Sequence, residues 1–79
     1  MIISEHACKE MEHSDISEEE VRQCLEHGEK VIKQLVKGEL RFGKELEFKE
    51  RKIMVIYTRQ QDEVRVITAY PIRRKKQWQ

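Results

Sequence analysis

The stretch KIMVIYTRQQDEVRVITAY, residues 52–70, contains the strongest strand signals in the chain. It holds two runs rich in β-branched and aromatic residues, KIMVIYT and EVRVITAY, and a polar break at residues 59–63 separates them. Each run has the length of a strand. A break this short joins antiparallel neighbours, because a parallel return needs a crossover of about a dozen residues or more. We therefore expect a hairpin whose two apolar strands lie in the middle of a sheet.

The strand-like pattern extends toward the N-terminus as far as residue 30. KVIKQLV, ELRF and ELEFKE are further runs of alternating character, and the breaks predicted between the runs lie at residues 37–38, 43–44 and 50–52. Together with the hairpin, these runs predict an antiparallel meander.

Two helices are predicted ahead of the sheet. Ser4 is a candidate N-cap for a helix over residues 5–13. Ser-Glu-Glu-Glu at residues 17–20 is a capping box that begins a second helix, and Gly28 is expected to end it in the left-handed conformation. Helices followed by a meander predict an α+β fold, with two N-terminal helices packed on a four-stranded antiparallel β-sheet.

Length and composition limit the class of protein. The chain has 79 residues, which is enough for a single domain over residues 1–79 and leaves no room for a second. No stretch has 18 consecutive apolar residues, and the first residues lack the pattern of a signal peptide. We therefore expect a cytoplasmic protein without a membrane partner.

Charge is distributed unevenly along the chain. Residues 1–29 carry nine acidic and two basic side chains, a net of −7, whereas residues 30–79 carry fourteen basic and six acidic, a net of +8. This asymmetry predicts either a basic surface for a polyanion or attraction between copies of the chain. The basic set, with Tyr70 and Trp78 interleaved, is Arg41, Arg51, Arg65, Arg73, Arg74, Lys75 and Lys76. It fits phosphate contacts combined with base stacking, although a terminal run of cations is also typical of a solvated tail.

The histidines and cysteines are the candidates for metal binding. His6-x-Cys8 and Cys24-x-x-His27 place thiols and imidazoles close in sequence, and zinc uses both kinds of ligand. Each unit is incomplete beside a zinc finger, and both cysteines fall at apolar positions of their predicted helices. Core packing therefore explains the cysteines better, and we expect reduced thiols, no metal and no other cofactor. The histidines remain candidates for acid–base catalysis near neutral pH.

Two segments resemble a known family. SEHACKEMEHSDISEEEVRQCLEHGE, residues 4–29, is similar to the opening of small, mostly bacterial domains grouped as the domain of unknown function 4258 family, with a histidine-alanine pair in the first helix and isoleucine-serine before the second. VITAYPIRRKK, residues 66–76, resembles the closing strand of that family, in which valine or isoleucine, threonine, any residue and tyrosine lead into basic residues.

This resemblance implies a fold akin to the RelE, barnase and colicin-type ribonuclease domains. It also implies a toxin-type, metal-independent ribonuclease, in which the RNA 2′-hydroxyl attacks the adjacent phosphate. Carried onto this chain, the catalytic candidates are His6, Thr68 and Tyr70, with His6 as the acid–base group and Thr68 as a hydrogen-bond donor. The candidate nucleic-acid contacts are Arg41, Arg73, Arg74, Lys75 and Lys76.

Glu10 and Ser14 stand where this family usually has arginine. A carboxylate in place of a guanidinium repels a phosphodiester, so the alternative hypothesis is a non-catalytic RNA- or protein-binding module of the same fold. RNA, an antitoxin-like protein and a second copy of the chain, forming a homodimer, are the candidate partners. Whether the chain is an enzyme stays open at this level.

Overall fold

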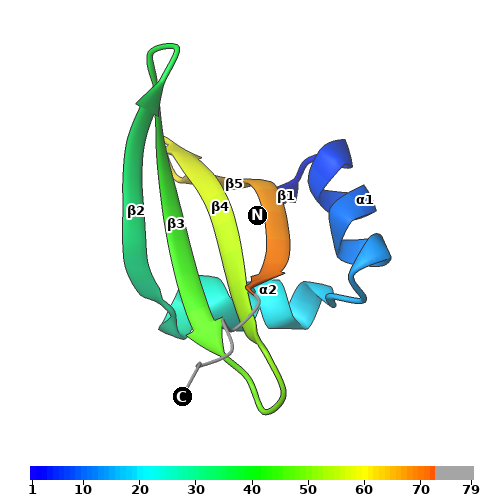
Figure 1. Ribbon diagram of the computed structural model, residues 1–79. Coiled ribbons are helices and arrows are strands. Elements are labelled where there is room, and N and C mark those ends of the chain that lie inside the picture. The colour runs from blue at the N-terminus through cyan, green and yellow to red at the C-terminus, as the bar shows by residue number, and fades with distance from the viewer. Residues whose placement is uncertain (73–79) are drawn as a thin grey trace.

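The computed structural model describes residues 1–72, which form a five-stranded mixed sheet and two helices (Figure 1). Along the chain the elements are β1 (Ile2–Ile3), α1 (Glu5–His13), α2 (Glu18–His27), β2 (Glu29–Val36), β3 (Glu39–Glu47), β4 (Lys52–Gln60) and β5 (Glu63–Ile72). The strand order in the sheet is β1-β5-β4-β3-β2, so β4 and β5, the two strands predicted from residues 52–70, are both internal. None of the helices in the described range is long and apolar enough to cross a membrane.

Strand β1 corrects the predicted sheet of four antiparallel strands. Strands β2 to β5 form the predicted antiparallel meander, but β1 adds a fifth strand that runs parallel to β5, with Ile2 opposite Arg65 and Ile3 opposite Val66. Two residues are too few to show an alternating pattern in the sequence. The long connection through both helices and the meander is what allows the parallel pairing.

Gly43 lies inside β3, where a break between two strands was predicted. Strand β3 continues through this residue and pairs Gly43 with Ile32 of β2 and Ile56 of β4. A Cβ atom at this position would lie 2.9 Å from Cβ of Ile32 and 3.0 Å from Cδ1 of Ile56. The glycine therefore makes room for two neighbouring side chains, and the prediction of a turn here was wrong.

The predicted helix starts are confirmed. The Ser4 side chain accepts a hydrogen bond from the amide of Ala7 at 3.0 Å, and α1 spans the expected residues. At the start of α2, the Ser17 side chain accepts from the Glu20 amide at 3.0 Å, and the Glu20 carboxylate accepts from the Ser17 amide at 2.9 Å. Both hydrogen bonds of the capping box are therefore present, and they satisfy two backbone amides that would otherwise lack partners.

The end of α2 differs from the prediction. Gly28 has a φ of −74°, so it does not adopt the left-handed conformation. Helix α2 runs directly into the extended strand β2, and the chain at Gly28 passes close to β3. A Cβ atom here would lie 2.8 Å from the carbonyl oxygen of Glu45 and would also collide with the carbonyl oxygen of Cys24. Gly28 is therefore required by the close approach of backbone segments.

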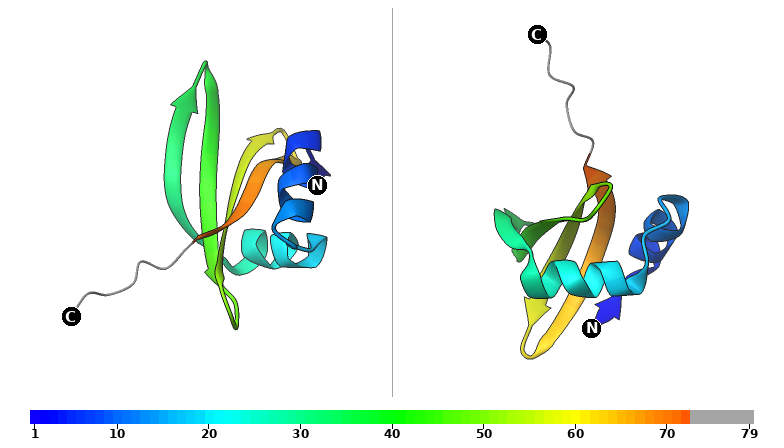
Figure 2. Two further views of the ribbon diagram at one scale, coloured as in Figure 1. Left: turned by 45° about the vertical axis from the view of Figure 1, so that its right-hand side comes forward. Right: turned by 90° about the horizontal axis from the view of Figure 1, so that it is seen from below.

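Both helices pack on one face of the sheet and share one core. Helix α1 lies against β5, and α2 lies against β3 and β4 (Figure 2). The core residues are Ala7, Met11, Ile16, Val21, Cys24, Ile53, Val55, Val66 and Ala69. Cys24 is buried as predicted, but Cys8 is exposed, because Ala7 and Met11 form the buried stripe of α1 and Cys8 lies beside it.

The β2–β3 hairpin extends beyond both helices (Figure 1). Its cross-strand pair Leu35 and Leu40 is exposed for that reason, with 71% and 41% of the residue surface accessible. We call the sheet surface opposite the helices the open face. The hairpin tip and the start of α1 lie at the same end of the sheet, and the candidate site lies there.

Candidate functional site

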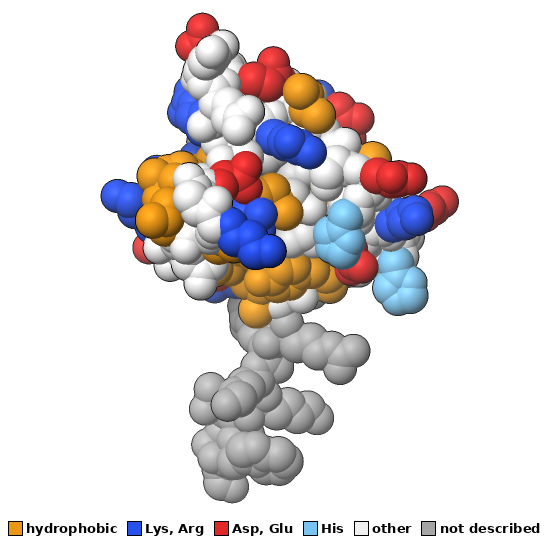
Figure 3. All heavy atoms as spheres, turned by 90° about the horizontal axis from the view of Figure 1, so that it is seen from above, with side chains coloured by type: hydrophobic (Ala, Val, Ile, Leu, Met, Phe, Trp, Pro, Cys, Tyr) orange, Lys and Arg blue, Asp and Glu red, His pale blue; other side chains and the backbone are white. Residues whose placement is uncertain are grey.

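A hollow of about 380 Å³ opens between the first turn of α1 and strands β3, β4 and β5. Its lining residues are Ser4, His6, Glu39, Arg41, Thr58, Arg65 and Ile67. We call it the His6 hollow. Figure 3 looks onto this end of the molecule, where Lys/Arg, Asp/Glu and His side chains gather around a surface of backbone and other side chains. Segments more than sixty residues apart in the sequence therefore contribute to one site.

The sheet register positions the two arginines of the hollow. Arg41 on β3 is opposite Thr58 on β4, and Thr58 is opposite Arg65 on β5. Residues directly opposite one another on neighbouring strands project their side chains to the same face of the sheet. Two guanidinium side chains therefore flank Thr58 in one row across the open face.

Thr58 fixes the strand that carries the charged residues. Its residue surface is 2% accessible, and its Oγ1 donates a hydrogen bond to the carbonyl oxygen of Leu40 at 2.8 Å. Leu40 lies between Glu39 and Arg41, so this bond ties their segment of β3 to β4. Because the hydroxyl proton is used within the protein, Thr58 is a positioning residue for its charged neighbours.

A β-bulge in β5 holds the start of α1 beside the row. Ile56 pairs with Thr68 and Tyr57 pairs with Val66, which leaves Ile67 as the extra residue. The Ser4 Oγ donates to the carbonyl oxygen of Ile67 at 3.1 Å, and the Ser4 amide donates to that of Val66 at 3.0 Å. The N-cap of α1 is therefore anchored on the bulge, and this contact places exposed His6 at the hollow.

The charges of the hollow are only partly paired. The Glu39 carboxylate accepts a hydrogen bond from Nε of Arg41 at 2.9 Å. The Arg65 side chain is exposed and makes no hydrogen bond or ion pair with any other residue in the range 1–72. The His6 hollow thus contains an imidazole, a carboxylate, a paired guanidinium and an unpaired one. This set can bind an anion and exchange protons with it.

The structure brings together some of the predicted site residues and separates others. His6 and Arg41 line the same hollow. Thr68 and Tyr70 lie farther along β5 and do not line it; Thr68 is half-buried opposite Ile56, and Tyr70 is 37% accessible. The roles predicted for these two residues stay predictions. The remaining predicted contacts, Arg73, Arg74, Lys75 and Lys76, and the aromatic Trp78 lie outside the described residues.

Sequence reasoning missed Glu39 and Thr58 as site residues and included Arg65 only in the general basic set. One of these was detectable, because Glu39-x-Arg41 is the spacing that puts two side chains on the same face of a strand. The other two were not, because pairing Thr58 with Arg65 requires the register of β4 on β5, and a bulge shifts that register.

The cysteines and histidines form no metal cluster in the part of the chain that the structure describes, where no group of three or more His, Cys, Asp or Glu side chains is suitably placed. The thiol of Cys24 lies 3.2 Å from the carbonyl oxygen of Lys44 and 3.6 Å from that of Ile53. Burial raises the pKa of Cys24 to about 11, so this residue is a neutral thiol at neutral pH.

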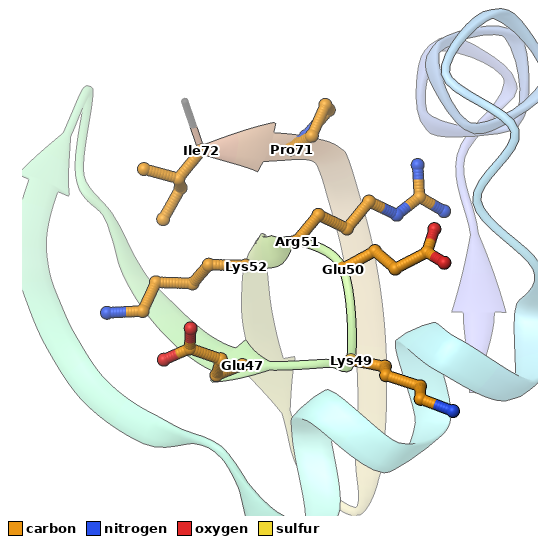
Figure 4. Close-up of a pocket in the computed structure, with 7 residues that line it drawn as sticks. All are labelled: Glu47, Lys49, Glu50, Arg51, Lys52, Pro71 and Ile72. Carbon is orange, nitrogen blue, oxygen red and sulfur yellow. The ribbon is translucent and has the colours of Figure 1, made fainter. Parts of the chain in front are cut away.

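A larger hollow, of about 530 Å³, lies at the opposite end of the sheet (Figure 4). Its lining residues are Glu47, Lys49, Glu50, Arg51, Lys52, Pro71 and Ile72. Its arginine is already engaged, because the Arg51 guanidinium donates to the carbonyl oxygens of Ser14 at 2.7 Å and Asp15 at 2.6 Å. Lys52 is paired with Glu45 at 3.3 Å. This hollow is therefore less suited to an anionic ligand than the His6 hollow.

Comparison with known proteins identifies a family and no individual relative. No curated protein and no solved structure matches the chain. A model of the family described as domain of unknown function (DUF4258) matches residues 3–71, which include both helices and nearly all of the meander. The chain therefore belongs to the DUF4258 family.

Proposed function

We propose that this chain is a ribonuclease-like protein that binds a phosphodiester of RNA in the His6 hollow and cleaves it. The observation that carries this proposal is the set of groups that line one hollow: an imidazole, a carboxylate and two guanidinium groups. RNA cleavage through the 2′-hydroxyl needs a base, an acid and cationic stabilisation of the phosphorane. The hollow supplies a candidate for each.

In the proposed reaction, the Glu39 carboxylate takes the proton of the 2′-hydroxyl, and the 2′-oxygen forms a bond to phosphorus. The bond between phosphorus and the 5′-oxygen of the next nucleotide breaks. Protonated His6 then gives its proton to that leaving oxygen. The products are a 2′,3′-cyclic phosphate and a 5′-hydroxyl, and solvent restores the protons of both side chains.

The two arginines stabilise the charge that develops on the phosphate oxygens. Arg65 donates hydrogen bonds to the phosphate from a guanidinium that makes none with the described residues. Arg41 shares its guanidinium with Glu39, and protonation of that carboxylate during the reaction frees Arg41 for the phosphorane. His6 lies in the first turn of α1, where the helix dipole adds a positive potential. The electrostatic stabilisation therefore increases as the transition state is approached.

The alternative is that the hollow binds RNA without cleaving it. The observation that favours the alternative is Glu10, which follows His6 by one helical turn and lies on the same side of α1. Its carboxylate opposes the approach of a second phosphate, at a position where the family usually has arginine. The relationship to the RelE and barnase ribonucleases stays a prediction, because no solved structure matches the chain.

The deciding experiment incubates the pure protein with end-labelled single-stranded RNA in the presence of a chelator, and reads binding, product length and product ends from the same samples. We expect cleavage to 2′,3′-cyclic phosphate ends. Glu39→Gln and His6→Ala should each lower the cleavage rate by about 100- to 10,000-fold, the usual contribution of general acid–base catalysis. His13→Ala, which removes an exposed histidine at the other end of α1, is the matched control and should retain full activity.

Circular dichroism of each variant separates loss of chemistry from loss of fold. Salt-sensitive binding by the wild-type protein without any product would reject catalysis and establish the binding module. Full activity in both Glu39→Gln and His6→Ala would show that cleavage occurs elsewhere on the chain. If the wild-type protein neither binds nor cleaves RNA, both functions are excluded.

A further inference from the structure

A second hollow adjoins the His6 hollow at the tip of the β2–β3 hairpin. Its volume is about 300 Å³, and its lining residues are Lys37, Gly38, Glu39, Leu40, Thr58, Arg59 and Gln60. Glu39 and Thr58 line both hollows, so the two are neighbours on the surface. We propose that this second hollow, the tip hollow, binds the nucleotide next to the cleaved phosphodiester. The inference rests on the proposed function and narrows its substrate to single-stranded RNA longer than a dinucleotide.

The tip hollow carries two cations that are free to meet a phosphate. Lys37 and Arg59 are both exposed, and neither side chain makes a hydrogen bond or an ion pair with another residue among those described. With Arg41 and Arg65 of the His6 hollow, they give four cationic side chains around two hollows that share Glu39 and Thr58. Four cations in two adjacent groups suit two successive phosphates rather than one.

The backbone holds Lys37 at a defined place. Lys37 and Gly38 form the two-residue turn between β2 and β3, with φ values of +50° and +80°. Positive φ at both central residues is the feature of the type I′ turn, whose twist matches that of the flanking strands. The base of the Lys37 side chain is therefore fixed by a regular hairpin.

The tip hollow also has an apolar wall. Leu40 lines it and is 41% accessible. The face of an unpaired base can cover this apolar surface, whereas a base within a duplex is stacked on its neighbours and presents only its edges. The combination of free cations with an apolar wall favours a single-stranded nucleic acid over a duplex.

The test measures binding of two uncleavable ligands, 2′-O-methyl versions of a dinucleotide with one phosphodiester and of an eight-nucleotide single strand. Arg59→Gln and Lys37→Gln should each weaken binding of the octamer by about three- to tenfold, as loss of one hydrogen bond of ordinary strength at an exposed site would. Each should also reduce the slope of log affinity against log salt by about 0.7, the value for one phosphate contact on a single strand. Binding of the dinucleotide, followed by NMR titration, should not change.

Arg22→Gln is the matched control, because it removes the same charge from the exposed surface of α2. An equal loss in this control would mean that only total charge matters, and it would overturn the tip hollow. A second outcome is that octamer binding is unchanged in Arg59→Gln and Lys37→Gln but lost in Arg65→Gln. It would reject nucleotide binding in the tip hollow and retain phosphate binding in the His6 hollow. Equal affinity for a duplex octamer would overturn the preference for single strands. Absence of wild-type binding to both ligands would reject the inference together with the RNA function on which it rests.

Discussion

Arg51 and Arg65 are the same residue type at opposite ends of the sheet, but their surroundings differ. The Arg51 guanidinium donates three hydrogen bonds, to the carbonyl oxygens of Ser14 and Asp15 and to the Glu20 carboxylate, at 2.7, 2.6 and 3.1 Å. The Arg65 guanidinium makes none with any residue in the range 1–72. A structural arginine therefore differs from one available to a ligand in whether protein groups already occupy its guanidinium.

Arg51 meets a need that the helices create. The last carbonyl groups of a helix lack partners within it, and Ser14 and Asp15 follow directly after α1. Asp15 turns the chain toward α2 with a φ of +57°. The β3–β4 turn supplies the missing donor, and the same guanidinium contacts the capping box of α2. We call the end of the sheet with Arg51 and the β3–β4 turn the closed end. We call the end with the His6 hollow the open end.

The largest expected difference between the two ends is in stability. Arg51→Ala should lower the free energy of unfolding by about 3 kcal/mol, because it leaves two carbonyl oxygens and a carboxylate without their charged donor. Arg65→Ala should change it by no more than about 0.5 kcal/mol, as is usual for an exposed side chain without a partner. Urea denaturation of the two variants measures both values. A loss in Arg65→Ala as large as that in Arg51→Ala would contradict the assignment of the two ends.

The closed end was the more predictable of the two from sequence. The capping box at Ser17 is a local signal, in which the partners lie three residues apart, and it is confirmed. The meander was predictable for the same reason, because alternation and short breaks are local. Strand β1 was not, since its pairing with β5 links residues more than sixty positions apart.

The candidate site depends mainly on contacts that are distant in sequence. His6 could be proposed from its place in a resembling segment, and Arg41 from the basic set. Their meeting with Arg65 requires the sheet register, the bulge at Ile67 and the anchoring of Ser4 on that bulge. None of these leaves a periodic signal. A prediction based on the closing strand therefore favoured Thr68 and Tyr70, whereas the hollow lies at the other end of β5.

Gly28 at the closed end and Gly38 at the hairpin tip differ in what an added methyl group would meet. Gly28→Ala at the closed end should cost about 2 kcal/mol, because the new methyl group would push against the carbonyl oxygens of Cys24 and Glu45. Gly38→Ala at the hairpin tip should cost about 1 kcal/mol, because its Cβ would have no neighbour within 4 Å and only the positive φ is unfavourable. Thermal unfolding followed by circular dichroism measures both. A larger loss of stability in Gly38→Ala than in Gly28→Ala would mean that the backbone around Gly28 shifts to accommodate a methyl group more easily than its contacts predict.

The smallest expected effect is a loss of stability at alkaline pH that arises from Cys24. Burial raises the pKa of this thiol in the folded protein to about 11, whereas a thiol in the unfolded chain ionises near pH 9. Between these values the unfolded chain binds fewer protons than the folded one, so the free energy of unfolding falls as pH rises. The contribution is fully present below about pH 8 and should decrease by about 1 kcal/mol between pH 8 and pH 10.

Cys24→Ala and Cys8→Ala test this effect as a pair. Burial also raises the pKa of Tyr57, which lowers stability in the same direction above pH 10, so the comparison is made at pH 8 and pH 10. Cys8 is exposed, and Cys8→Ala should keep the alkaline loss, whereas Cys24→Ala should remove about 1 kcal/mol of it even though its stability at pH 8 is lower. Urea denaturation at the two pH values gives the difference. An identical pH dependence in both variants would mean that solvent reaches the thiol of Cys24. The closed end would then be less tightly packed than its hydrogen bonds indicate.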